Sequence, residues 1–370
     1  MAQININLSK IEYNADVLRT LLENNDIHLT PVIKCVAGDS RIIETLIQSG
    51  FTHFAESRLE NINEDFKGQC DYLLLRPTSK KHYTQLIKSV KMSMQTEIES
   101  IKEINEIAKQ LNQKHQIMLM IDWKDRREGV ITYDVLNYIE EIIKMTHIQL
   151  IGIAFNFMCF KSSAPTEEDI LKINQFVDAI EYNLGFRLKV VSGGNSSMIP
   201  QLMYNDLGRI NELRIGEALF RGIDTTTNQS IPMLFQNAIT LEAEILEIKP
   251  RLSDNNQCYL QAIVDIGYVD TDVNKIKPIK NDVSIVGASS DHLMINLNNQ
   301  DYYKVGDIIE FAMEYEALSQ VMYHNHMTKH YFKDNYIHSL NSKMVNSPLL
   351  INKNVNQFFV GIINHINFNK

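Results

Sequence analysis

The sequence has few cysteines, and they lie far apart. Its 370 residues contain only Cys35, Cys70, Cys159 and Cys258, with no C-x-x-C pair among them. This spacing argues against a disulfide framework and against a cysteine-ligated zinc site. It is typical of reduced thiols, and we therefore expect a cytoplasmic protein.

Positive charge and long apolar runs are also scarce. The 36 lysine and arginine residues face 45 aspartate and glutamate residues, which gives a net charge of -9 at pH 7. This balance argues against nucleic acid as a partner, because a phosphate backbone requires a basic face. No apolar run is long enough to cross a membrane, and the start, MAQININLSKIEYNADVL, lacks the regions of a signal peptide. We expect neither a membrane partner nor a secretory leader.

What the sequence does contain is a repeated alternation of short apolar runs and amphipathic segments between residues 29 and 220. Apolar strands separated by helices are typical of a parallel sheet covered by helices. Eight such units predict an α/β fold with an N-terminal (β/α)₈ barrel; a doubly wound open sheet is the alternative. The eight runs are LTPVIK, FTHFAE, DYLLLR, KMSMQ, HQIMLMID, IQLIGIAFN, LKVVSGG and NELRIG.

The pattern changes near residue 230. Runs such as CYLQAIVDIGYV and VGDIIEFAM alternate with turn residues and lose helical periodicity, which predicts a C-terminal all-β domain. We expect the barrel over residues 1–230, with its first strand in either domain, and the β domain over residues 231–327. Residues 328–370 form an extension to which the sequence assigns no fold.

Polar residues recur where the predicted barrel strands end. The C-terminal ends of the strands carry the chemistry in such barrels. Any strand has to end in something polar, so one position means little, but the whole set favours a functional site. The set comprises Lys34, Glu56–Arg58, Arg76, Arg127, Asn156, Ser192–Pro200 and Arg214.

The segment Ser192–Pro200, SGGNSSMIP, has the composition of a phosphate-binding loop. Two glycines let the backbone approach a ligand, and an asparagine and two serines offer donors at the start of a helix. The alternative is a tight turn with a serine N-cap. Lys34 and Arg214 at the same end of the barrel favour a phosphorylated carbonyl cofactor, held by the lysine as a Schiff base with the arginine under its ring.

These motifs resemble those of the alanine racemase-like, fold-type III enzymes that use pyridoxal 5'-phosphate, most closely the ornithine racemase-like branch. The resemblance covers residues 3–325. It implies amino-acid racemisation in a head-to-tail homodimer, on a basic amino acid such as ornithine or lysine, or on alanine. The matching motifs are PVIKCVAGD, FAESRLENI, DWKDRREGV, SGGNSS, LRIGEALFRG, LEAEILEIK, VGASSDHL and YEALSQVMY.

The resemblance also implies roles for single residues. Lys34 matches the Schiff-base lysine, which is also a proton-transfer base, and Arg127 matches an arginine near the phenolic oxygen of the cofactor and the substrate. Arg214 matches the arginine at the pyridine nitrogen, which such a cation leaves unprotonated, favouring proton removal and return. The other matches are Asn195, Ser196, Ile215, Gly216 and Tyr323 around the phosphate, with Asp291 at the substrate and Tyr268 at the entrance.

Three positions depart from the pattern of true alanine racemases. Gly38 replaces a phosphate-contacting tyrosine, and Ser192, at the cofactor, replaces a histidine beside the pyridine ring. Both differences favour the ornithine racemase-like branch. No residue aligns with the tyrosine that supplies the second proton. Tyr259 and Cys258 are the candidates, because either exchanges a proton when its pKa is lowered, and the alternative is that both are ordinary strand residues.

The sequence leaves two other functions as alternatives. The segment FAESRLEN also resembles small, non-catalytic pyridoxal phosphate-binding proteins of cofactor homeostasis, but these lack a β domain. A decarboxylase of basic amino acids requires a catalytic cysteine in the β domain, and the surroundings of Cys258 do not match one. No metal is expected, because the spacing of His324, His326 and His330 fits no common site.

Overall fold

The computed structural model describes residues 2–337 of the chain. These residues divide into two compact units. The barrel unit comprises residues 12–34 and 38–234, and the β unit comprises residues 2–11, 35–37 and 235–337. Residues 338–370, the greater part of the predicted extension, lie outside the described residues.

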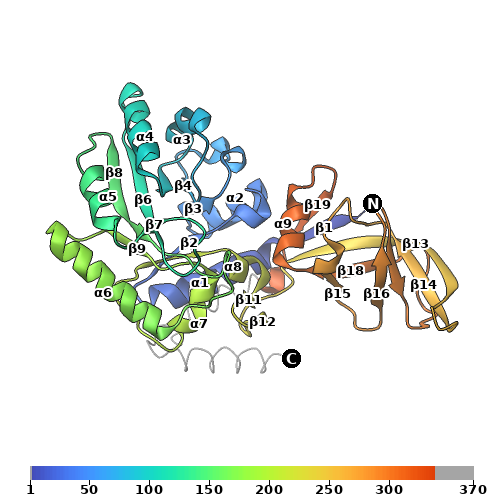
Figure 1. Ribbon diagram of the computed structural model, residues 1–370. Coiled ribbons are helices and arrows are strands. Elements are labelled where there is room, and N and C mark those ends of the chain that lie inside the picture. Colours follow the sequence, from blue (N-terminus) through green and yellow to red (C-terminus); the bar gives the residue numbers. More distant parts are fainter. Residues whose placement is uncertain (1, 338–370) are drawn as a thin grey trace. The chain divides into compact units, whose positions relative to one another are not determined.

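The barrel unit is built on a ring of parallel strands (Figure 1). Its strands pair in the order β2-β10-β9-β8-β6-β5-β4-β3, and Val32, just after β2, bridges Ala55 of β3. Because the two ends of the sheet meet, the predicted (β/α)₈ barrel is confirmed and the open-sheet alternative is wrong. The strands are β2 (His28–Pro31), β3 (His53–Glu56), β4 (Asp71–Leu74), β5 (Met92–Gln95), β6 (His115–Asp122), β8 (Ile148–Ala154), β9 (Val190–Ser192) and β10 (Glu212–Ile215).

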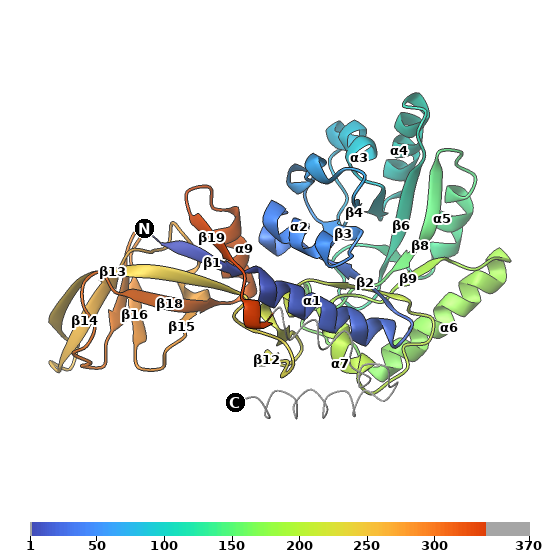
Figure 2. The same ribbon diagram turned by 180° about the vertical axis from the view of Figure 1, so that it is seen from behind.

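Helices cover the outside of this ring, as Figures 1 and 2 show. The longest connection contains α6 (Glu167–Leu184), which begins at a capping box of Thr166 and Asp169 and ends at Gly185 with φ 73°. Within residues 2–337, no helix is both long enough and apolar enough to span a membrane. The other helices are α1 (Leu8–Glu23), α2 (Ser40–Gln48), α3 (Tyr83–Ser89), α4 (Ile98–Gln110), α5 (Val135–Ile142), α7 (Ile199–Leu202) and α8 (Glu217–Arg221).

The interior of the barrel is apolar along most of its strands. Its core cluster consists of Val32, Ala55, Leu73, Met94, Met118, Met120 and Ala154. Residues two apart on a strand face the same side, so Thr30 faces the interior like Val32, and so does Arg214, which pairs with Thr30 across β2 and β10. The sequence therefore directs a guanidinium group into the barrel.

The β unit is a mostly antiparallel sheet, which confirms the predicted all-β character. Its path is β15-β18-β13-β14-β17-β16, and β1 (Gln3–Asn7) pairs antiparallel with β13 and parallel with β19. The domain limits at residues 230 and 327 stay predictions. The remaining elements are β13 (Ile239–Leu252), β14 (Cys258–Val264), β15 (Ile276–Pro278), β16 (Ser284–Ala288), β17 (Leu293–Asn296), β18 (Ile308–Met313), α9 (Tyr315–Tyr323) and β19 (Thr328–Phe332).

Candidate active site

Lys34 lies directly after the first barrel strand, where the chain turns. The preceding residues are held on both sides: the N–H of Val32 donates to the carbonyl of Ile215 at 2.8 Å, and the N–H of Ile33 donates to the carbonyl of Ala55 at 2.9 Å. Lys34 then opens a short 3₁₀ turn and is half-buried. The lysine therefore stands on a rigid strand end, as a cofactor-anchoring amine requires.

Gly38 closes the turn after Lys34, and only glycine fits there. Its φ is +62°, in the left-handed region, and a Cβ atom would lie 2.2 Å from the carbonyl oxygen of Asn61. A side chain at this position would displace the segment that carries Asn61. The local backbone at position 38 therefore requires glycine.

The loop after β9 forms a cradle, which we define as residues 193–197. The N–H of Gly193 donates to the carbonyl of Glu212, and the carbonyl of Gly194, whose φ is +127°, accepts from the N–H of Arg214, both at 2.9 Å. Asn195 caps the following 3₁₀ turn by accepting from the N–H of Ser197 at 2.9 Å. The predicted phosphate loop is therefore held between β9 and β10 at the same barrel end as Lys34.

Hydroxyl groups line this cradle. The Ser196 hydroxyl accepts from the N–H of Ala218, at the start of α8, at 3.2 Å. The buried hydroxyl of Ser197 finds no hydrogen-bond partner among residues 2–337. An unsatisfied buried hydroxyl is costly unless a ligand or water meets it, so the cradle has capacity for an oxygen-rich group.

Arg214 is buried inside the barrel, with 4% of its surface exposed. One guanidinium nitrogen, Nη2, donates to the carbonyl of Phe155 at 2.8 Å, and Nη1 donates to the Ser192 hydroxyl. Burial lowers the pKa of Arg214, whereas the nearby Glu212 carboxylate acts to raise it. The structure therefore places Ser192 on Arg214, where it orients the guanidinium group.

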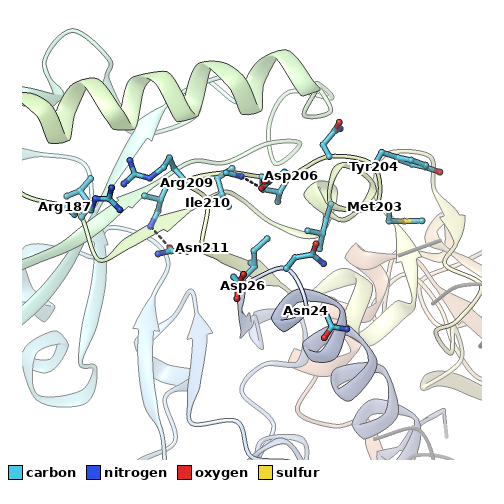
Figure 3. A pocket seen from close by; sticks show the side chains of 17 residues that line it. Asn24, Asp26, Arg187, Met203, Tyr204, Asp206, Arg209, Ile210 and Asn211 are labelled. Carbon is cyan, nitrogen blue, oxygen red and sulfur yellow. Dashed lines mark hydrogen bonds between the residues drawn. The ribbon is translucent and has the colours of Figure 1, made fainter. Parts of the chain in front are cut away.

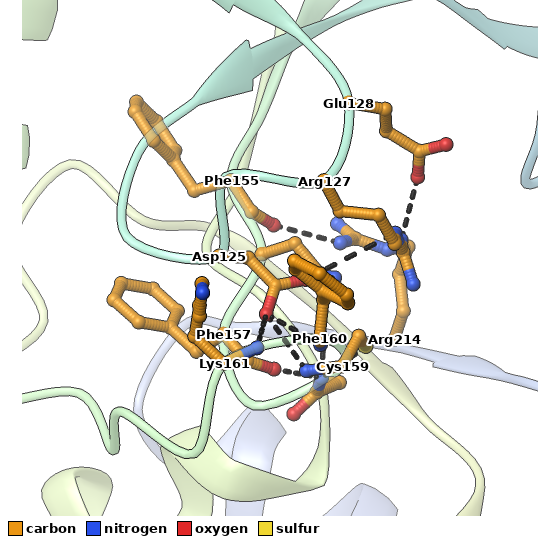
Figure 4. Close-up of polar contacts among 11 residues, drawn as sticks. Asp125, Arg127, Glu128, Phe155, Phe157, Cys159, Phe160, Lys161 and Arg214 are labelled. Carbon is orange, nitrogen blue, oxygen red and sulfur yellow. Dashed lines mark hydrogen bonds and ion pairs between the residues drawn. The ribbon is translucent and has the colours of Figure 1, made fainter.

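Arg127, in the connection after β6, lies among acidic groups (Figure 4). Its Nη2 is 2.5 Å from Glu128 Oε1, and its Nε is 4.0 Å from Asp125 Oδ2. Burial acts to lower the pKa of Arg127, but Cys159, Glu128 and Asp125 outweigh it and raise the pKa. The arginine therefore stays charged and is held in one orientation.

Sequence reasoning missed how Asn156 and Cys159 connect to the cradle. The Asn195 side-chain amide donates to Asn156 Oδ1 at 3.3 Å, to the carbonyl of Phe157 at 2.6 Å, and contacts the Cys159 sulfur at 3.3 Å. In the sequence, Asn156 is only one of several polar strand ends, and no motif marks Cys159. Their partner is 36 to 39 residues further along the chain, so no local pattern reports the contact.

The groups at this barrel end fit pyridoxal phosphate. The cradle suits a phosphate group, because it combines glycines with two serines and the buried Ser197 hydroxyl meets no partner among the described residues. Arg214, held by the uncharged acceptors Ser192 and Phe155, suits a ring nitrogen that accepts a hydrogen bond. Lys34 offers a primary amine, the group that would bind the cofactor's carbonyl carbon.

The opposite end of the barrel, where the strands begin, holds a cavity of about 1030 Å³ (Figure 3). It is lined by the connections that lead into β2, β9 and β10, among them Asn24, Asp26, Arg187 and Arg209. Parallel strands place these connections opposite the ends that carry Lys34 and the cradle. Volume alone therefore does not identify the active site in this barrel.

The β unit brings together two of its predicted site residues. Tyr268 and Tyr323 line one cavity of about 550 Å³. Asp291 is exposed, and its backbone packs against Gly267, next to Tyr268, closely enough that a Cβ atom on the glycine would lie 2.6 Å from the Asp291 nitrogen. These residues thus gather in one region of the β unit.

The two candidates for the second proton lie elsewhere in the β unit. Cys258 and Tyr259 begin β14, whereas Tyr268 follows its other end; the strand from Tyr259 to Val264 spans about 17 Å. The Tyr259 hydroxyl donates to Gln261 Oε1 at 2.8 Å, and Cys258 is exposed. The structure does not gather them with Tyr268 and Tyr323.

Comparison with known proteins extends these observations. A family model described as alanine racemase, N-terminal domain, matches residues 6–223. The ornithine racemase of Acetoanaerobium sticklandii is 31% identical over 336 residues, which cover 85% of this chain and 95% of that protein. The lysine racemase of Thermotoga maritima is 30% identical over 337 residues, which cover 86% of this chain and 94% of that protein.

Solved alanine racemases share the fold. The enzyme from Clostridium difficile 630 matches with a TM-score of 0.73 and 21% identity, over 90% of this chain and 96% of that chain. The enzyme from Bartonella henselae, solved with covalently bound pyridoxal phosphate, matches with a TM-score of 0.70 and 16% identity, over 90% of this chain and 99% of that chain. Both likenesses concern the architecture.

The barrel, the β unit and the fitted cradle define a class, the pyridoxal phosphate-dependent barrel enzymes. Within that class, the chain belongs to the alanine racemase family, because the family model matches more than half of it and its relatives align over nearly their whole length. The chain is accordingly an amino-acid racemase, and its cofactor is pyridoxal phosphate. The expected family, enzyme class and cofactor are thus confirmed.

Proposed function

We propose that this racemase interconverts the two enantiomers of a basic amino acid such as ornithine or lysine. The observation that carries the proposal is the nearly full-length alignment with relatives named for these two substrates. The glycine at position 38, which distinguishes this chain from the alanine racemase pattern and which its backbone requires, supports the same branch.

Lys34 is the proposed base on one face of the substrate. Its amine stands at the end of β2, from which it anchors the cofactor and, once displaced by the amino group of the substrate, removes or returns the α-proton. Pyridoxal phosphate, when bound, supplies an electron sink that makes this α-proton acidic. A primary amine at a rigid strand end performs both roles of Lys34.

Arg214 and the cradle are the proposed holders of the cofactor. Asn195 and Ser196, with the backbone of Ile215 and Gly216, bind the phosphate, and Arg214 donates to the ring nitrogen. Because guanidinium remains protonated, Arg214 is a donor only, and it keeps a proton off that nitrogen. This limits electron withdrawal and favours proton return at the α-carbon over transamination.

The proton on the other face comes from a second group. We propose that the enzyme is a head-to-tail homodimer, in which the β unit of one subunit completes the site of the other and presents Tyr259 or Cys258. We propose that the β unit also presents Tyr323 to the phosphate, Tyr268 at the entrance of the site and Asp291 to the substrate. The small number and wide spacing of the cysteines, with no C-x-x-C pair, support a cytoplasmic location.

Chiral chromatography tests the substrate class. Purified protein with pyridoxal phosphate is incubated separately with L-ornithine, L-lysine, L-alanine and L-glutamate. We expect D-ornithine or D-lysine to accumulate, with kcat/KM about 100-fold or more above that for alanine, because a charged side chain needs a matched partner in the site. Cofactor binding with no D-product from any substrate would contradict the proposal and favour the non-catalytic cofactor-binding function.

A further inference from the structure

Asp125, in the connection after β6, has no part in the mechanism above, yet it is firmly bound (Figure 4). Its side chain is almost fully buried, and Oδ1 accepts the backbone N–H groups of Cys159, Phe160 and Lys161 at 2.9, 2.8 and 3.1 Å. Successive N–H groups on one oxygen form an anion-binding nest. Asp125 thereby ties the connection after β8 to the connection after β6 through charge-assisted bonds.

The second oxygen of Asp125 begins a chain of side-chain amides. Asp125 Oδ2 accepts from Asn156 Nδ2 at 3.1 Å, and Asn156 Oδ1 accepts from Asn195 Nδ2 at 3.3 Å. Asn195 belongs to the cradle, and its Oδ1 accepts from the N–H of Ser197. Asp125 and Asn195, which are 70 residues apart in sequence, are therefore joined through Asn156 by two hydrogen bonds.

Backbone groups fix the direction of the hydrogen bonds that run from Asp125 through Asn156 to Asn195. Asn195 Nδ2 donates to the carbonyl of Phe157 at 2.6 Å, while its Oδ1 accepts from an N–H group, so the amide of Asn195 cannot turn over. Asn156 must therefore present its oxygen to Asn195 and its NH₂ group to position 125. Only a residue with two acceptor oxygens serves both the nest and Asn156.

We propose that Asp125 is a positioning residue, which acts through Asn156 to fix the side chain of Asn195 and, through it, the shape of the cradle that binds the phosphate of the cofactor. The inference rests on the proposed role of the cradle. Asp125 also faces Arg127, whose Nε lies 4.0 Å away, so it steadies a second cofactor-side group. Both oxygens of Asp125 accept from protein donors, so we propose that Asp125 orients other residues and does not itself contact the cofactor.

The substitution Asp125→Asn tests the direction of these hydrogen bonds. Asparagine keeps one oxygen for the nest, but it then turns an NH₂ group towards the NH₂ group of Asn156, and two donors face each other. If the amide of Asn156 turns over to accept from position 125, its NH₂ group then faces the NH₂ group of Asn195. Either arrangement leaves two donors facing each other, and the second one disturbs Asn195 in the cradle. We expect the dissociation constant for pyridoxal phosphate to rise about tenfold or more.

Adding Asn156→Asp to Asp125→Asn restores the pattern. The aspartate at 156 accepts from the new amide at 125 with one oxygen and from Asn195 with the other. We expect the double variant to bind the cofactor within about threefold of wild type. The matched control is Asp134→Asn, the same change on an exposed aspartate, which should leave cofactor binding unchanged.

Equilibrium dialysis of the full-length holoenzymes measures cofactor release, and circular dichroism measures the melting temperature of each variant. Weaker binding in the single variant with recovery in the double variant supports the proposal. Wild-type binding in Asp125→Asn, or a double variant as weak as the single, overturns it, and so does a change in melting temperature alone. If wild type itself holds no pyridoxal phosphate, the proposed function fails and takes the inference with it.

Discussion

The two ends of the barrel are both polar, but their polar groups are arranged differently. At the end where the strands begin, groups of opposite charge pair with one another: Asp71 lies 2.5 Å from Lys91 and 3.5 Å from His53. Thr30 donates to Glu212 at 2.6 Å on the same side. A cavity of about 300 Å³ lies among them.

At the end where the strands finish, the buried cation Arg214 lies beside uncharged acceptors, whereas Arg127 is paired with acidic side chains. The buried guanidinium of Arg214 is held by the carbonyl of Phe155 and the hydroxyl of Ser192, and Lys34 stands on the neighbouring strand end. Positive charge that neutral groups hold remains available to an anionic ligand. The two ends therefore differ in how their buried charges are held, and the presence of a cavity does not by itself mark the active site.

Arg214→Lys breaks the cofactor end most strongly. Lysine keeps the charge but loses the planar fork that reaches Ser192 and Phe155 together, so the ring nitrogen proposed to lie there would lose an oriented donor. We expect kcat/KM to fall about 100-fold. The measurement is the rate of racemisation under subsaturating substrate.

The matched control is Arg187→Lys, on an exposed arginine at the other barrel end. Its rate should stay within about twofold of wild type, because a solvated arginine loses little when it becomes lysine. Equal losses in both variants would show that the two ends do not differ in the way described.

His115→Gln probes the end where strands begin, through stability. His115 is buried, with its ring 2.8 Å from the Ser93 hydroxyl, and burial lowers the pKa of His115 to about 4. The unfolded chain binds a proton near pH 6.5 and the folded chain does not until about pH 4. Folding stability from this group is therefore complete above pH 6.5 and is lost as the pH falls towards 4, by about 3 kcal/mol.

Urea unfolding at pH 7 and at pH 4.5 measures that loss. The Gln variant should lose less stability than wild type between the two pH values, and its racemase rate at pH 7 should be unchanged. His292→Gln, on an exposed histidine, provides the control and should behave as wild type in both respects. If the His115 variant loses as much stability between pH 7 and pH 4.5 as wild type, the pH dependence does not come from His115.

Lys91→Ala should give the smallest effect. The ion pair with Asp71 is close, at 2.5 Å, but both side chains are more than a third exposed, so solvent screens it. We expect a change in unfolding free energy of about 1 kcal/mol or less and no change in racemisation. Thermal melts at 50 mM and 500 mM salt measure it, and a large loss of activity would place the pair in the catalytic machinery.

The sequence predicts the barrel and much of its cofactor end. The apolar runs are continuous because the strands are covered on both faces, and the strand-end rule gathers Lys34, the cradle and Arg214 without any contact being known. The need for glycine at position 38 comes from the carbonyl of Asn61, which approaches through folding alone.

Other contacts have no signal in the sequence. Asp125 binds backbone N–H groups 34 to 36 residues away, and backbone groups leave no mark on residue type. The parallel pairing of β1 with β19 joins segments about 325 residues apart by main-chain bonds. Long-range polar pairing of this kind is read from coordinates, since periodicity reports only which face is buried.

The central claim is that Lys34, at the end of the first barrel strand, moves the α-proton of a basic amino acid. Its most direct test is proton exchange in D₂O, with L-ornithine or L-lysine, followed by NMR of the α-proton and by chiral chromatography. We predict that wild-type holoenzyme exchanges the α-proton and inverts the handedness, and that Lys34→Ala does neither. Exchange in Lys34→Ala at the wild-type rate, or no inversion by the wild-type enzyme, would contradict the account.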